Sequence, residues 1–120
     1  MPTVLRRYTI NNAGSRPDSH DLVGCQIVQN DNNTYDFIAP GEGVVASTLN
    51  NPPIEFTFAN FKGWDWIIRV TSSTPTTMTG VWSNDDPNDV SPADEGDSWT
   101  ASGTGVGEPG EDEARAASAN

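Results

Sequence analysis

The sequence predicts an all-β protein in which about eight antiparallel strands form an up-and-down meander that closes into a small barrel. An apolar residue occupies every second position at 54–58 and again at 66–70, and this period of two is typical of a strand with one buried face. Similar segments recur along the chain between short links rich in Gly and Asn. Apolar residues make up only 34% of the sequence, which suits many short strands joined by turns.

Turn residues divide the chain into its expected strands. Residues 31–33 and 41–43 contain Asn or Gly, which tolerate a positive φ, so each segment predicts a hairpin turn. Pro52 and Pro53 stop one strand before the next begins, because proline cannot donate to a ladder, and residues 61–63 turn the chain again. In chain order, the expected strands are 3–11, 22–29, 34–39, 44–49, 54–60, 64–71, 77–83 and 98–102.

The shortness of these links favours antiparallel neighbours, and no amphipathic helix is predicted that could cross a parallel sheet. An open sheet of this size would leave two edges and a wide apolar face exposed. Closure of the sheet removes the edges and gives the apolar face an interior, so a barrel is favoured. A two-sheet β-sandwich of the same strands is the alternative.

The net charge of −11 is concentrated near the C-terminus, because ten of the 17 acidic residues follow residue 84. We expect a single domain over residues 1–104 and a disordered acidic tail over residues 105–120, which have too few apolar side chains to form a core. The five basic residues of the domain are scattered along it, which excludes nucleic acids and anionic membrane surfaces as partners.

The expected cellular compartment follows from the absence of a predicted membrane span and of a predicted signal peptide. No segment approaches the roughly 20 apolar residues of a membrane span, and the N-terminus has no apolar stretch of signal-peptide length. We therefore expect a cytoplasmic protein, or a secreted one whose leader has been removed. Cys25 is the single cysteine, so it predicts no intrachain disulfide and is expected to be a small buried side chain.

Arg6 is the first candidate for ligand binding. Alternation along the first strand places Arg6 and Tyr8 on the same face as Ile10, which points one guanidinium toward the interior. A buried guanidinium requires a partner, and the residues expected on the neighbouring inward faces include no carboxylate. A ligand carboxylate, phosphate or carbonyl could supply that partner. Alternatively, Arg6 lies at the barrel mouth and reaches water.

Aromatic residues on the other inward faces predict an interior that holds an apolar or aromatic small molecule. A solid core without a cavity is the alternative, because the same side chains can fill the space. The predicted ligand-binding residues are Arg6, Tyr8, Tyr35, Phe37, Phe56, Phe58, Trp66, Trp82 and Trp99.

Two other functions remain open at this point. An exposed Trp64 beside the Gly63 turn could stack on a sugar ring, as in a carbohydrate-binding module. The acidic tail, together with six acids at residues 85–97, could instead govern assembly of a structural or interaction protein, such as a surface-decorating subunit.

Catalysis, metal binding and cofactor binding receive little support. His20 lies near Asp18 and Asp21, and Cys25 follows, but sequence neighbours in a loop are weak evidence for a catalytic pair. The acids at residues 85–97 do not fit the spacing of a helix-loop-helix calcium site. We expect no catalytic, metal or cofactor site.

The expected meander, which ends in a strand within residues 97–102, resembles the calycin-type barrels, a group that includes lipocalins and avidin-like proteins. This resemblance implies a small molecule bound inside the barrel. Lipocalins carry a Gly-x-Trp element in their first strand, whereas here residues 80–82 place it near the end of the chain. The resemblance therefore covers architecture and transfers no site residue.

Overall fold

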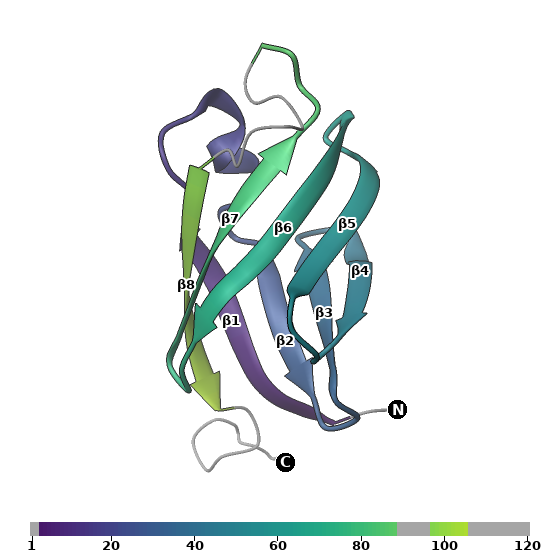
Figure 1. The fold of residues 1–120 in the computed structure, drawn as a ribbon, viewed down its shortest axis with the longest axis vertical. Helices are drawn as coiled ribbons and strands as arrows, with labels where there is room; N and C mark the ends of the chain where they lie inside the picture. Colours follow the sequence, from purple (N-terminus) through teal and green to yellow (C-terminus); the bar gives the residue numbers. More distant parts are fainter. Residues whose placement is uncertain (1–2, 89–96, 106–120) are drawn as a thin grey trace.

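The computed structural model describes residues 3–88 and 97–105, which form eight antiparallel strands and one short 3₁₀ helix (Figure 1). The predicted acidic tail after Gly105 and residues 89–96 of the predicted acidic loop lie outside this range. The elements are β1 (Val4–Asn12), η1 (Pro17–Asp21), β2 (Gln26–Asn30), β3 (Thr34–Ala39), β4 (Gly43–Leu49), β5 (Ile54–Phe61), β6 (Trp64–Ser73), β7 (Thr77–Asn84) and β8 (Asp97–Gly105).

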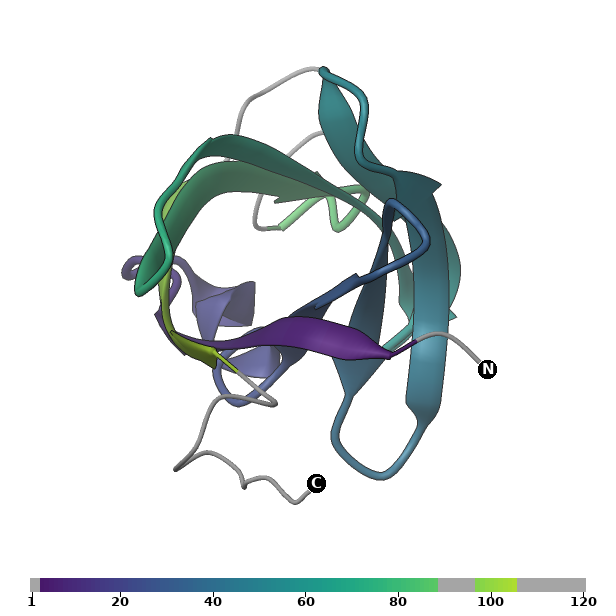
Figure 2. The ribbon, with the colours of Figure 1, turned by 90° about the horizontal axis from the view of Figure 1, so that it is seen from below.

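The strands form one sheet in the order β4-β3-β2-β1-β8-β7-β6-β5. The first strand pairs with the last, so the sheet curls into a nearly closed barrel, seen along its axis in Figure 2. Strands β4 and β5 complete the circle side by side, but they are the two ends of the hydrogen-bonded order and share no ladder. The predicted up-and-down barrel is thus confirmed over the β-sandwich, and its one seam lies between β4 and β5.

Closure of the barrel depends on a glycine opposite a tyrosine. In the β1–β8 pair, Tyr8 lies opposite Gly103, and the Tyr8 ring occupies the space that a Cβ atom at residue 103 would fill. Any larger residue at this position would push the ring away from β8. Gly103 therefore lets the two end strands approach with the Tyr8 side chain inside the barrel.

The segment at residues 22–25 differs from its prediction. It was expected to belong to a strand, but η1 and a turn precede β2, with the Ser19 amide donating to the Arg16 carbonyl and the Leu22 amide to the Ser19 carbonyl. Pro17 suits the first turn of such a helix, because its fixed φ is helical and its missing N–H is not needed there. Leu22 and Cys25 are fully buried, so the apolar pattern of this segment reflects a buried turn.

Aromatic rings fill the middle of the barrel. Phe37 and Phe58 stack with ring centroids 5.1 Å apart, and Trp66 contacts both Phe61 at 5.7 Å and Trp82 at 5.3 Å. Burying a large apolar side chain contributes about 1.5–3 kcal/mol or more, so these contacts supply much of the stability. This part of the interior is a packed core.

The described residues include no helix long and apolar enough to cross a membrane, since η1 has five residues.

We predict that Gly103→Ala destabilises the protein by about 1–3 kcal/mol, because the new methyl group overlaps the Tyr8 ring. Urea unfolding of the single variants and of the Tyr8→Ala/Gly103→Ala double variant tests this cause. Removing the ring removes the overlap, so the double variant should lose less stability than the two single variants together. Strictly additive losses would show that the ring is not what excludes a side chain at residue 103.

Candidate ligand-binding site

The two ends of the barrel differ in how they are covered. At one end, which we call the helix end, η1 lies across the opening (Figure 1). At the other, which we call the termini end, β1 begins, β8 stops, and the turns 31–33, 50–53 and 74–76 connect the strands. Figure 2 views the barrel from the termini end.

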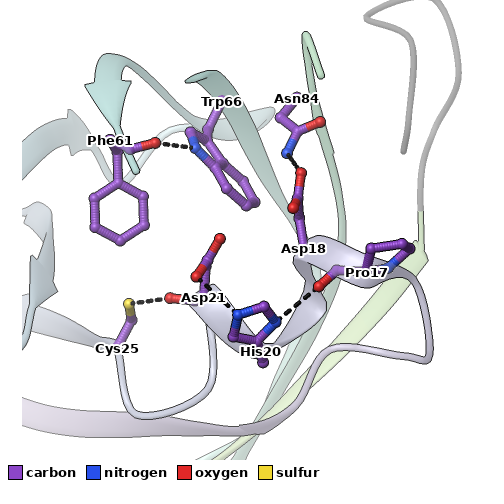
Figure 3. Close-up of polar contacts among 8 residues, drawn as sticks. All are labelled: Pro17, Asp18, His20, Asp21, Cys25, Phe61, Trp66 and Asn84. Atoms are coloured by element: carbon purple, nitrogen blue, oxygen red, sulfur yellow. Dashed lines mark hydrogen bonds and ion pairs between the residues drawn. The ribbon is translucent and has the colours of Figure 1, made fainter. Parts of the chain in front are cut away.

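At the helix end, hydrogen bonds hold η1 and the segment before it against β7, and one of them is drawn in Figure 3. Asn84 of β7 is buried and donates from Nδ2 to the Asp18 carboxylate of η1 at 2.8 Å. The Trp82 indole N–H donates to the carbonyl of Ala13, in the segment leading to η1, also at 2.8 Å. Because both bonds join η1 or its approach to β7, the helix end is held closed by residues far apart in the sequence.

His20 and Cys25, the candidate catalytic pair at the helix end, each contact other residues of the described chain. His20 is 80% exposed, with Nδ1 at 2.7 Å from the Pro17 carbonyl and Nε2 at 3.4 Å from the Asp21 carboxylate. The buried Cys25 thiol donates to the backbone carbonyl of Asp21 (Figure 3). Burial raises the pKa of this thiol to about 11, so it is protonated at neutral pH and is a poor nucleophile.

Among residues 3–88 and 97–105, no three His, Cys, Asp or Glu side chains are grouped closely enough to hold a metal ion. Of the acidic loop predicted from the sequence, Asp85, Asp86 and Asp97 fall within these residues.

A row of polar side chains crosses the termini end on the inward face of the sheet. Arg6 of β1 lies opposite Gln29 of β2, which in turn lies opposite Tyr35 of β3. Arg6 is half-buried, and its Nε atom is buried without a hydrogen-bond partner. Neither Gln29 nor Tyr35 carries a charge that could neutralise the guanidinium, as the sequence had indicated.

Two buried phenols lie within the electrostatic reach of Arg6. The Tyr8 hydroxyl donates to the Thr74 carbonyl at 2.7 Å. Burial raises the pKa of Tyr8, and the positive charge of Arg6 opposes that rise. Burial likewise raises the pKa of Tyr35, opposed by a hydrogen bond with Ser73 and by the charge of Arg6. Both phenols therefore stay neutral at physiological pH, and Arg6 lies close to both.

A groove of about 230 Å³ opens at the termini end, between the loop 50–53 and the paired strands β5 and β6. Its apolar floor is formed by Ile54 and Val70, which lie opposite each other in the β5–β6 pair, are half-buried and pack against the core. Ser73 lines the groove and lies near enough to Tyr35 to lower the pKa of its hydroxyl, so one end of the groove adjoins the polar row. The residues lining it are Pro52, Pro53, Ile54, Val70, Thr71, Ser72 and Ser73.

The predicted site residues divide into two groups. Arg6, Tyr8 and Tyr35 gather at the termini end, whereas the six others form the buried aromatic core. Trp64 is half-buried and packs against the same core. Sequence reasoning missed the groove, although the paired prolines mark its rim. The six predicted ligand-binding residues that lie in the core are Phe37, Phe56, Phe58, Trp66, Trp82 and Trp99.

We predict that the buried Cys25 thiol makes stability depend on pH. The unfolded thiol ionises near pH 9.0 and the folded one near 11, so its contribution is complete below pH 9 and is lost as the pH rises through that window. In urea unfolding, the difference in unfolding free energy between wild type and Cys25→Ala should shrink by about 1–2 kcal/mol from pH 9 to 11. Tyrosine ionisation occurs in both proteins and cancels. A difference that stays constant would show that the folded thiol ionises like an exposed one.

Comparisons of the chain with protein-family models, with curated proteins and with solved structures give no significant match.

Proposed function

We propose that the protein binds a small apolar or aromatic molecule at the termini end of the barrel. The observation that carries this proposal is the groove floored by Ile54 and Val70, two apolar side chains that pack on the core and are only half covered. Small-molecule sites are typically concave and mainly apolar, with a few polar groups that fix orientation. Here those polar groups are Arg6 and Tyr35.

The packing of the interior supports this end of the barrel as the binding site. The aromatic rings contact one another through the middle of the barrel, and hydrogen bonds from Trp82 and Asn84 hold the helix end closed. A ligand at the termini end needs neither the rings nor these bonds to move. The aromatic core then serves as the rigid base of the site, with Tyr8 and Tyr35 at its border.

The other functions have less support. Sugar stacking needs an open indole face, but Trp64 is half-buried against the core. An assembly function would depend on acidic segments that lie largely outside the described residues. The likeness to calycin-type barrels agrees with small-molecule binding at the level of architecture alone.

The proposal can be tested with N-phenyl-1-naphthylamine, an uncharged aromatic probe whose fluorescence rises in apolar sites. Wild type should bind it, and Val70→Trp, which fills the groove, should weaken binding about tenfold or more. Ser72→Trp is a second blocking variant on the exposed rim of the groove, where it does not disturb the core.

Val23→Trp is the matched control, because it makes the same change at an exposed valine of the helix end. It should leave probe affinity unchanged, and near-ultraviolet circular dichroism should confirm that each variant is folded. Absence of probe binding to wild type, or equal weakening by Val23→Trp, would refute the termini-end site.

A further inference from the structure

We infer that the ligand is an apolar acid, whose carboxylate is bound by the guanidinium of Arg6 while its apolar body lies in the groove at Ile54 and Val70. This inference rests on the proposed function and adds the charge and the orientation of the ligand. It follows from the electrostatics around Arg6, from the contrast with other arginines, and from the acids of the helix end.

The charge of Arg6 lacks a counter-charge among the groups described around it. Its Nε atom is buried and makes no hydrogen bond, and its cross-strand neighbour Gln29 is neutral. The two phenols near it are protonated, and Tyr8 already donates its hydrogen to the Thr74 carbonyl. A half-buried guanidinium in such surroundings attracts an anion strongly, because water screens its charge only in part.

Two other arginines show how this chain satisfies a guanidinium when it serves the fold. Arg7 lies on the opposite face of β1 and donates from Nη1 to the Gln26 side chain at 2.8 Å. Arg69 pairs with the Glu55 carboxylate across the β5–β6 ladder at 3.0 Å. Arg6 differs from both, since its Nε makes no hydrogen bond to any acceptor within residues 3–88 and 97–105.

A carboxylate fits this position in both geometry and chemistry. The guanidinium presents its donors in a planar fork that matches two carboxylate oxygens. The neutral Tyr35 phenol, close to the same charge, is a further polar group at the site. Ser73 connects Tyr35 to the groove, so an acid bound at Arg6 can extend its apolar part over Val70.

The placement of the described acids favours Arg6 as the position of the ligand's carboxylate. Asp18, Asp21, Asp65 and Asp85 lie at the helix end and would repel an anion there. The termini end also carries Asp31 and Glu55, but Asp31 accepts from the Thr3 amide and Glu55 pairs with Arg69. The polar row itself contains no carboxylate, so we expect the acid group at Arg6.

Two ligands of the same shape test this inference, 1-naphthaleneacetic acid and the uncharged 1-naphthaleneacetamide. Displacement of N-phenyl-1-naphthylamine at low salt and neutral pH gives both affinities. Wild type should bind the acid about 10- to 100-fold more tightly than the amide, as expected for a charge-assisted hydrogen bond in a partly buried site. Arg6→Met should abolish this preference, because it lowers the affinity for the acid far more than the affinity for the amide.

Arg7→Met is the matched control, because it removes the same charge from the next residue on the opposite face. It should keep the preference for the acid. Arg6→Lys keeps the charge but loses the fork, so it should keep only part of the preference.

Thermal unfolding of the free protein distinguishes a binding role of Arg6 from a structural one. Because Arg6 Nε makes no hydrogen bond in the fold, Arg6→Met should not lower the unfolding temperature and should raise it if the charge is costly. A marked decrease would show that Arg6 supports the fold, and would overturn the inference.

The outcomes separate the two proposals. If the probe does not bind, the proposed function fails and the inference fails with it. If the probe binds but neither compound displaces it, the inference alone fails, because the site then takes an apolar molecule without taking an acid. If both compounds bind equally to wild type, or if the preference survives in Arg6→Met, the groove binds ligands but Arg6 does not select acids. A preference lost equally in Arg7→Met would reflect overall charge and would also overturn the inference.

Discussion

The pairing of β1 with β8 is the contact on which the rest of this structure depends. It joins the two strands that are farthest apart in the sequence, so the chain must offset a large entropy of loop closure before this pair stabilises it. Without it, the sheet would divide into two four-stranded sheets, β4-β3-β2-β1 and β8-β7-β6-β5, and each would expose an apolar face to water. In the closed barrel, the side chains of Tyr8 and Ile10 are buried in the interior, and Arg6 lies at the edge of that interior.

The two halves of the barrel differ in how completely they are packed, and the proposed function places binding in the less packed half. From the middle to the helix end, aromatic rings contact one another and buried indole N–H groups find carbonyl partners, as in Trp66 to Phe61 and Trp82 to Ala13. At the termini end, the inward positions carry Arg6, Gln29 and Tyr35, and packing is incomplete. A well-packed half can hold such an unsatisfied half in a fixed geometry, which is the usual relation between a scaffold and a site.

Much of the fold could be predicted from the sequence, because a period of two and the turn residues at 31–33, 41–43 and 61–63 are local signals. The inward position of Arg6 followed from the same alternation. The prediction of a strand at residues 22–25 was wrong, because the apolar residues of a buried turn form the same pattern as those of a short buried strand. The groove could not be foreseen, because it depends on the β5–β6 register that sets Ile54 opposite Val70 and on the path of the loop 50–53 beside the end of β6, which no local sequence signal specifies.

At the seam between β4 and β5, no ladder of backbone hydrogen bonds fixes the distance between the two strands. Every other neighbouring pair of strands is joined by a ladder, so widening the barrel elsewhere would break several backbone bonds at once. At the seam, β4 and β5 can separate while both remain attached to their inner partners, β3 and β6. The girth of this barrel is therefore least constrained beside the loop that carries Pro52 and Pro53, where a small change in strand separation would break no ladder.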